Sequence, residues 1–228
     1  MFALAACLAS AAPVFEDTMA QRTLACAACH GKEGRAEPDG YYPRIAGKPA
    51  GYLYNQLLNF RDGRRHYGLM TRLLDPLSDA YLLAIAQYFA SLDLPYPPAR
   101  RSKESSAVME RGQALALRGD EARRIPACVQ CHGAALTGVA PATPGLLGLP
   151  RDYLNAQLGA WKAGQRHAQA PDCMARIARD LAPGDLTAVA SWLAAQTPPA
   201  DGKPAATLPQ SPPIACGSAA LPAEVKRP

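Results

Sequence analysis

The chain has few aromatic side chains and no long hydrophobic run. Phe, Trp and Tyr together make up 7% of its 228 residues. No stretch of roughly 18 uninterrupted apolar residues occurs, which excludes a membrane-spanning helix in the chain as given. At about 150 residues per domain, the length allows one large domain or two small ones. Two small domains would share little large apolar surface, so we expect something besides side chains to fill their interiors.

A strong charge of one sign is also lacking. Lys and Arg number 24 against 19 Asp and Glu, a formal net charge of +5 that is spread along the chain. No basic run is interleaved with aromatic residues, so we expect no nucleic-acid partner. No alternating strand pattern of useful length appears either, which leaves helices as the expected secondary structure.

Cysteine and histidine, by contrast, are concentrated in two short clusters. Four of the seven cysteines and two of the four histidines lie in two C-x-x-C-H-G motifs that begin at Cys26 and Cys128. The similarity continues downstream, with Tyr-Leu-x-x-Gln-Leu starting at Tyr52 and again at Tyr153. Further matches follow through both copies, so two homologous units are the economical explanation.

The repeat predicts an all-α protein with two tandem domains and a proline-rich C-terminal tail. In each domain, apolar residues at helical spacing predict an early, a middle and a late helix, joined by long Gly- and Pro-containing loops. Prolines stiffen the segment between the domains, and eight prolines make the tail extended. The expected boundaries are a signal-like segment 1–15, domain 16–94, linker 95–104, domain 105–197 and tail 198–228.

C-x-x-C-H is the attachment sequence of a c-type haem. On a helical turn, both thiols lie on one face and can reach the two haem vinyl groups, while the adjacent histidine is held beneath the iron. A zinc site would place its cysteine pairs about 15–20 residues apart, and a thioredoxin-like dithiol needs a βαβ context that is absent. We therefore expect two covalently attached haem c groups, with His30 and His132 as proximal iron ligands.

A sixth iron ligand is expected from the loop between the middle and late helices. Met70 and Met174 coincide in the repeat and fall in that loop in each domain. A thioether ligand favours ferrous iron and raises the reduction potential. His66 and His167 are also equivalent and compete for this role. The methionines are the preferred prediction.

The order of these motifs, twice over, resembles the dihaem class I cytochromes c of the c-four type, over roughly residues 16–197. This resemblance implies two cytochrome c domains packed about a pseudo-twofold axis in a bacterial periplasm, with haems close enough to exchange electrons. At the matching positions of this sequence, the resemblance implies these haem-binding residues: thioether donors Cys26, Cys29, Cys128 and Cys131, proximal ligands His30 and His132, and distal ligands Met70 and Met174.

The resemblance also implies residues around the ligands. Pro43 and Pro144 match the family proline whose carbonyl accepts the second N–H of the proximal histidine, a contact that fixes the ring. Arg65 and Arg166 are candidate partners of the haem propionates, although ordinary solvated arginines would give the same pattern. One departure from the family is Cys173, a thiol directly beside the second distal methionine.

The first 15 residues resemble the end of a secretory signal. They are apolar and rich in small residues, with an A-x-A site at 9–11, while the residues before Cys7 would equally fit a bacterial lipobox. Either interpretation predicts export to the periplasm, and lipidation of Cys7 is the expected route to a membrane anchor. An ordinary ordered N-terminus is the remaining alternative.

Three cysteines are left after the haem motifs. If Cys7 is removed or lipidated, Cys173 and Cys216 remain as an even pair in an oxidising compartment, which predicts a disulfide. Such a bridge would hold the tail over the second methionine loop. The alternatives are two unpaired thiols, or Cys173 as an iron ligand of a low-potential or catalytic haem.

The predicted function is single-electron transfer by a periplasmic dihaem cytochrome, between a donor dehydrogenase or quinol-oxidising complex and a terminal acceptor. No bond is made or broken, so the protein itself is not expected to be an enzyme. Transient redox partners need only small, weak interfaces. A tightly bound cytochrome subunit of a periplasmic dehydrogenase is the first alternative. A dihaem enzyme, such as a peroxidase or a sulfur-compound oxidoreductase, is the second.

Overall fold

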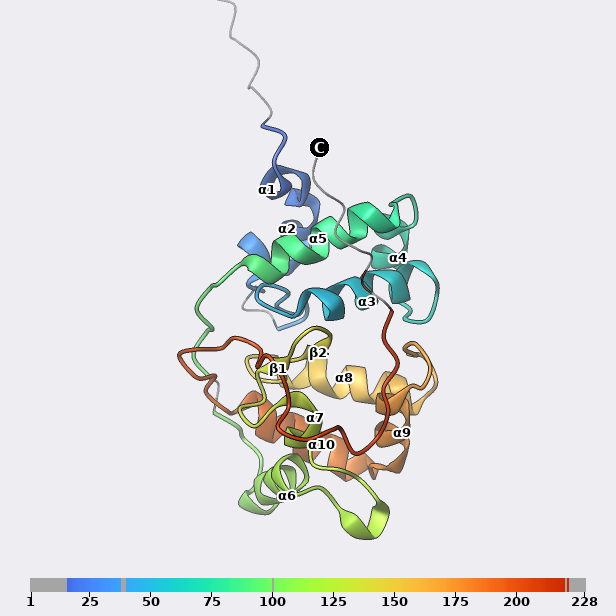
Figure 1. Cartoon of the computed structure of the whole chain (residues 1–228). Helices are drawn as coiled ribbons and strands as arrows, with labels where there is room; N and C mark the ends of the chain where they lie inside the picture. The colour runs from blue at the N-terminus through green and yellow to red at the C-terminus, as the bar shows by residue number, and fades with distance from the viewer. Residues whose placement is uncertain (1–15, 38–39, 100, 220, 222–228) are drawn as a thin grey trace, which may run out of the picture.

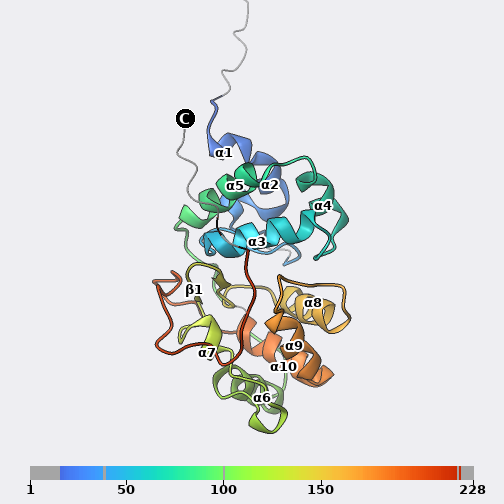
Figure 2. The same cartoon turned by 45° about the vertical axis from the view of Figure 1, so that its right-hand side comes forward.

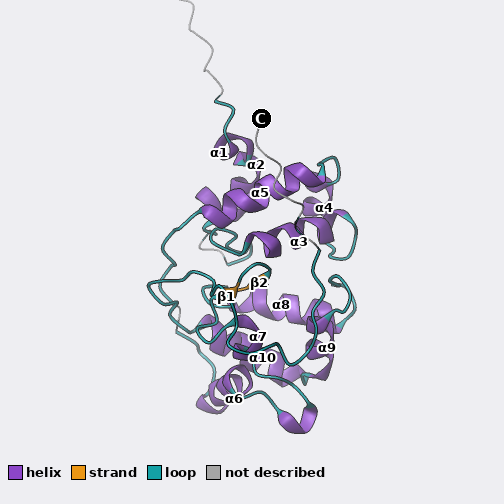
Figure 3. Cartoon of the chain, in the orientation of Figure 1, coloured by secondary structure: helices purple, strands orange, loops and turns teal. Residues whose placement is uncertain are grey.

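The computed structural model describes residues 16–37, 40–99, 101–219 and 221. The signal-like segment 1–15 and the last residues of the tail therefore lie outside the described residues. Helices dominate the described chain, and its short strands are confined to one small hairpin (Figure 3). The helices form two groups, one stacked on the other (Figure 1). This architecture confirms the predicted all-α, two-domain fold class.

The first domain is built around two long helices that carry the predicted apolar stripes. Ser78 caps the late helix, since its side chain accepts a hydrogen bond from the Tyr81 N–H at 3.3 Å. Leu82, Leu58 and Phe89 are buried where the middle and late helices pack together. The elements are α1 (Met19–Arg22), α2 (Leu24–His30), the 3₁₀ turn η1 (Lys32–Gly34), α3 (Ala50–Arg61), α4 (Gly68–Leu74) and α5 (Asp79–Ser91).

The second domain repeats this plan with a longer first helix. That helix crosses the late helix closely at Gly112, where a Cβ atom would lie only 2.1 Å from the carbonyl oxygen of Ala188. Glycine is therefore required at the crossing. The elements are α6 (Ser106–Leu117), η2 (Glu121–Arg123), α7 (Val129–His132), β1 (Gly138–Val139), β2 (Thr143–Pro144), α8 (Arg151–Lys162), α9 (Cys173–Asp180) and α10 (Pro183–Ala194).

The small hairpin of the second domain touches the first domain. β1 and β2 are antiparallel, and Gly138 is the partner of Pro144. The turn between them accepts a hydrogen bond from the Gly51 N–H at 3.0 Å, through the carbonyl of Pro141. The hairpin thus lies against the start of α3 and helps to fix how the two domains face each other (Figure 3).

The tail after residue 197 has no helix among its described residues, yet it is tied down along its length. Ala205 pairs with Val139 as a parallel bridge, and Gly217 donates to the Pro171 carbonyl at 2.8 Å. Figures 1 and 2 both show the tail running from the second domain up to the first. There the amide of Asn55 on α3 bonds to Ser218 and Ala219. The tail is a strap that connects both domains.

No helix among the described residues has the length and apolar character needed to cross a lipid bilayer.

Candidate functional site

The first cysteine motif forms the end of a helix, as its spacing predicts. Cys26 and Cys29 are three residues apart on α2, so their free thiols share one face. His30 ends the helix and is buried, and its Nδ1–H donates to the carbonyl oxygen of Pro43 at 2.8 Å. Gly31 follows with φ of 74°, which lets the chain turn away sharply behind the histidine. Only the Nε2 atom of His30 is left to bind a further group.

The second motif has the same geometry in the other domain. Cys128 and Cys131 are also free thiols, at the cap and within α7. The Nδ1–H of His132 donates to the carbonyl oxygen of Pro144 at 2.7 Å. The two proline carbonyls that the family resemblance implies are therefore in contact with the two histidines.

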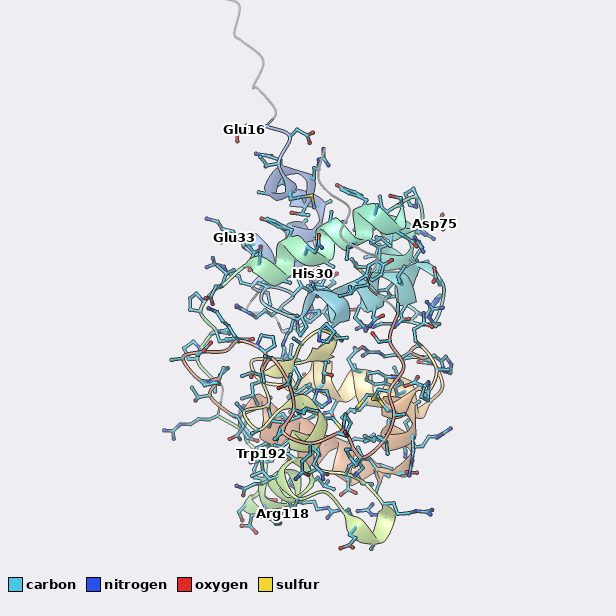
Figure 4. All side chains as sticks on the ribbon, in the orientation of Figure 1. Glu16, His30, Glu33, Asp75, Arg118 and Trp192 are labelled. Atoms are coloured by element: carbon cyan, nitrogen blue, oxygen red, sulfur yellow. A yellow bond between two sulfur atoms is a disulfide. The ribbon has the colours of Figure 1, made fainter. Side chains whose placement is uncertain are left out.

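Both motifs open onto one internal cavity of about 1130 Å³. Its walls are mostly apolar side chains of both domains, including Leu57, Ile85 and Phe89 in the first. Figure 4 labels His30 inside the first domain, where it borders this cavity. Such a volume inside two small domains agrees with the expectation that side chains alone do not fill their interiors.

Three of the four motif thiols have a raised pKa, which is unfavourable for binding a metal or acting as a redox dithiol. Burial raises the pKa of Cys26 and Cys131, and it raises the pKa of Cys128 to about 12. Metal ligands and redox-active cysteines need thiolates, which a lowered pKa provides. Among the described residues, no group of three or more His, Cys, Asp or Glu side chains gathers to hold a metal ion. The zinc and dithiol alternatives are therefore disfavoured.

The two candidate distal methionines line the same cavity, but their local structure differs from the prediction. Met70 lies on α4 and Met174 on α9, whereas both were expected in loops. The helix of Met174 begins because the Asp172 side chain accepts from the Ala175 N–H at 3.0 Å. The competing residues His66 and His167 are exposed, although His66 also borders the cavity.

Arg65 and Arg166 lie buried where the two domains meet, instead of on the surface. Their backbones form an antiparallel bridge, and each guanidinium stacks on an aromatic ring of its own domain, at 4.4 Å over Phe60 and 3.7 Å over Trp161. Burial lowers the pKa of Arg166 to about 10. The ordinary solvated arginines considered from the sequence are thereby ruled out.

These arginines share two glutamines across the interface in a reciprocal pattern. Arg65 donates to Gln56 of its own domain at 2.9 Å and to Gln157 of the other at 2.7 Å. Arg166 donates to Gln157 at 2.7 Å and to Gln56 at 2.8 Å. Arg65 also reaches the hydroxyl of Tyr153 at 3.0 Å. The exchange of equivalent contacts is what a pseudo-twofold arrangement produces.

Two further buried cations were not singled out from the sequence. Arg44 bonds to the carbonyls of Ala46, Leu94 and Pro95. Lys48 donates to the carbonyl of Gly145 in the other domain at 3.0 Å. Burial lowers the pKa of His132, and the charge of Lys48 lowers it further, while the bond to Pro144 opposes this shift. No repeated motif pointed to Lys48.

The predicted disulfide is present. Cys173 and Cys216 are bonded, which rules out both free thiols and Cys173 as an iron ligand. The bridge closes a sequence separation of 43 residues and fixes the tail beside Met174. Pro212 and Ile214 of the tail line the cavity on the side of the second domain.

Two helical domains, each presenting a C-x-x-C-H helix to a shared apolar cavity, define a tandem c-type cytochrome. Comparison with known proteins agrees. The chain is 39% identical over 186 residues to the thiosulfate dehydrogenase electron acceptor of Thiomonas intermedia (strain K12), a match that covers 82% of this chain and 85% of that protein. Further relatives are named cytochrome c4. No protein-family model matches the chain.

Solved structures give the same result. Reduced recombinant cytochrome c4 from Pseudomonas stutzeri matches with a TM-score of 0.66 at 30% identity, over 78% of this chain and 97% of that chain. Thiosulfate dehydrogenase (TsdBA) from Marichromatium purpuratum, "as isolated", matches with a TM-score of 0.66 at 35% identity, over 74% of this chain and 36% of that chain. The chain belongs to the cytochrome c4 family. It is a dihaem electron-transfer cytochrome with haem c as its cofactor.

Proposed function

We propose that each domain attaches one haem c covalently through its own cysteine pair. The thioether donors are Cys26 and Cys29 in the first domain and their counterparts in the second, Cys128 and Cys131. The free state of all four thiols, their helical spacing and their position on the cavity support this assignment. His30 and His132 are the proximal ligands, because each has only Nε2 left after bonding its proline carbonyl. Met70 and Met174 are the distal ligands.

The buried cations support an anionic group in the cavity. Arg65 and Arg166 are both buried, and neither forms an ion pair with a carboxylate among the described residues. Burying a charge without an opposite charge is costly, so a partner of negative charge is expected. The buried Nε1 of Trp161, which has no hydrogen-bond partner in the described chain, is a further unused donor on the cavity wall. Haem propionates fit these groups, with Arg65 and Arg166 as their partners.

When bound, each haem iron takes up and releases one electron between its ferric and ferrous states. The residues of this chain prepare the site for that change. The proline carbonyls hold the histidine rings in one orientation, and the mostly apolar walls suit a porphyrin ring. The methionine sulfurs favour the ferrous state. With a histidine and a methionine as ligands, each iron would have no open coordination position for a substrate, which fits a carrier.

We propose that the protein accepts electrons from a periplasmic dehydrogenase and passes them to a terminal acceptor. The observation that carries this proposal is the similarity, over 82% of the chain, to a protein named for accepting electrons from thiosulfate dehydrogenase. Covalent haem attachment and a disulfide are both consistent with an exported protein. Export would proceed through the segment 1–15, with membrane anchoring only if Cys7 is lipidated.

The direct test is reduction by a purified thiosulfate dehydrogenase and thiosulfate. We expect haem reduction only when enzyme and thiosulfate are both present, and oxidation when a terminal acceptor is added. Reduction by thiosulfate alone would contradict the carrier function and favour a sulfur-compound oxidoreductase. Peroxide turnover at rest would favour the peroxidase alternative.

A stable subunit of a dehydrogenase is the second candidate. It is favoured by the match to the TsdBA structure, in which the part similar to this chain covers 36% of the matched chain. Purification from the native source distinguishes the two candidates. A free carrier elutes alone at the mass of one chain, whereas a subunit stays bound to an enzyme through several columns.

A further inference from the structure

Lys48 belongs to the first domain, and its buried side chain contacts the second domain. Its side chain is 3% exposed, yet its ammonium group donates to the carbonyl oxygen of Gly145 in the second domain at 3.0 Å. No carboxylate forms an ion pair with it in the described chain. Burying a lysine without an ion-pair partner destabilises the folded state, so packing alone does not explain a lysine at this position.

The charge has no counterpart in the other copy. Most groups around the cavity occur in equivalent pairs, such as Arg65 with Arg166 and Gln56 with Gln157. At the position equivalent to Lys48, the second domain has Leu149, which is buried in its apolar core. Lys48 is therefore a difference in charge between the two copies.

Lys48 lies close to the proximal side of the second site. Its acceptor, Gly145, directly follows Pro144, whose carbonyl holds the Nδ1–H of His132 at 2.7 Å. Two other buried cations of the first domain have different partners: Arg44 donates to the carbonyls of Leu94 and Pro95, and Arg65 donates to Gln56 and Gln157.

We propose that Lys48 supplies the charge through which the first domain raises the reduction potential of the second haem above that of the first. The inference rests on the proposed haem assignment. Oxidation of a haem adds one positive charge to the site, and a nearby ammonium in a poorly screened interior opposes it. Electrons that enter either site then collect on the second haem.

The test is a redox titration that reads the two haems separately, by the methyl NMR signals of each haem. It uses Lys48→Met, which removes the charge at similar size, and Lys48→Gln, which keeps a donor for Gly145. Lys48→Arg keeps the charge, and Lys103→Met removes an exposed lysine as the control. All titrations are run at pH 6, because burial lowers the pKa of Lys48 to about 7.

In Lys48→Met and Lys48→Gln, we expect the reduced-to-oxidised ratio of the second haem to fall about tenfold at a given potential, a shift of about 59 mV for one electron. The first haem should change less, and Lys48→Arg and Lys103→Met should stay near the wild type. Equal shifts of both haems, no shift, or wild-type behaviour of Lys48→Gln would overturn the proposal. The spectrum of the unmodified protein tests the haem assignment independently, since it does not depend on Lys48.

Discussion

His30 and His132 are each held by one backbone hydrogen bond, and this contact decides which nitrogen remains for a ligand. The Nδ1–H of each ring donates to a proline carbonyl at 2.8 and 2.7 Å. The proton is thereby fixed on Nδ1, which leaves the Nε2 lone pair free. A ring that was free to rotate would bind iron less firmly.

The distal ligands can be tested one at a time, because the repeat supplies a matched pair. Met174→Ala removes the proposed sulfur ligand of the second haem and leaves Met70 in place. We expect about half of the sulfur-to-iron absorption to be lost, with cyanide binding to one haem of the two. Met70→Ala is the matched variant and should affect the first haem alone. Full retention of the absorption in either variant would contradict the assignment.

We expect that the interface arginines cannot be replaced by lysine without a loss of stability. Arg166→Lys keeps the charge but loses the forked hydrogen bonds to Gln157 and Gln56 and the stacking on Trp161. We expect the free energy of unfolding to fall by about 2 kcal/mol, measured by urea denaturation. The exposed Arg179→Lys is the control and should change it by less than about 0.5 kcal/mol. Equal effects of the two variants would contradict the structural role.

Some of these residues could be identified from the sequence, and others could not. Cys26, Cys29 and His30 have a fixed spacing that only one chemistry explains well, so they could be found from the motif. Arg65 and Arg166 could be found from the repeat, but not their shared contacts, which join residues about a hundred positions apart. Lys48 has no repeat partner, and only the three-dimensional contact with Gly145 reveals it.

Among the elements, α6 and α10 of the second domain are joined by a charged cluster at the start of α10. Asp185 accepts hydrogen bonds from Arg111 at 2.7 Å, and it forms an ion pair with Arg123 at 2.8 Å. The hydrogen bond from Arg111 contributes most to lowering the pKa of the Asp185 carboxyl, and the contact with Arg123 adds to this effect. Burial acts in the opposite direction but does not outweigh them. The cluster holds together two helices that enclose the core of the domain.

The cluster predicts a pH dependence of stability. A carboxyl whose folded-state pKa is lowered stabilises the fold above its unfolded pKa of about 3.9, and this contribution is lost as the pH falls through the folded value. Asp185→Asn should therefore lower the free energy of unfolding by about 2 kcal/mol at pH 7. The difference from the wild type should shrink steadily below about pH 4. A difference independent of pH would contradict this account.

The tail strap is anchored at one end by the Cys173–Cys216 disulfide and at the other by Asn55. Replacing both cysteines by alanine releases a loop with a sequence separation of 43 residues. We expect a loss of about 4 kcal/mol in the free energy of unfolding, together with faster cyanide binding at the second haem. Asn55→Ala frees only the far end of the strap and should leave cyanide binding unchanged. Unchanged cyanide binding in the cysteine variant would show that the strap does not hold Met174.

The long helices were predictable from apolar periodicity, whereas the short ones were not. α3, α5, α8 and α10 each have a buried stripe of helical period. α4 and α9 span seven and eight residues, too short for a clear period, and they depend on contacts with the rest of the domain. The helices that carry Met70 and Met174 were therefore expected as loops.

For the molecule as a whole, the repeat predicted two domains but not how they face each other. The facing surfaces are set by the hairpin against α3, by the shared glutamines and by the tail. All of these are contacts between residues far apart in the chain, which a periodic pattern cannot show. They bring the two motifs onto one cavity.

The most direct test of the central claim is an anaerobic reductive titration of the purified holoprotein, combined with its mass under denaturing conditions. We predict the mass of the processed polypeptide plus two haems, uptake of two electrons per chain, and spectra of two low-spin haems with histidine and methionine ligands. A single haem, haem lost on denaturation, or a high-spin site in the resting protein would contradict the account.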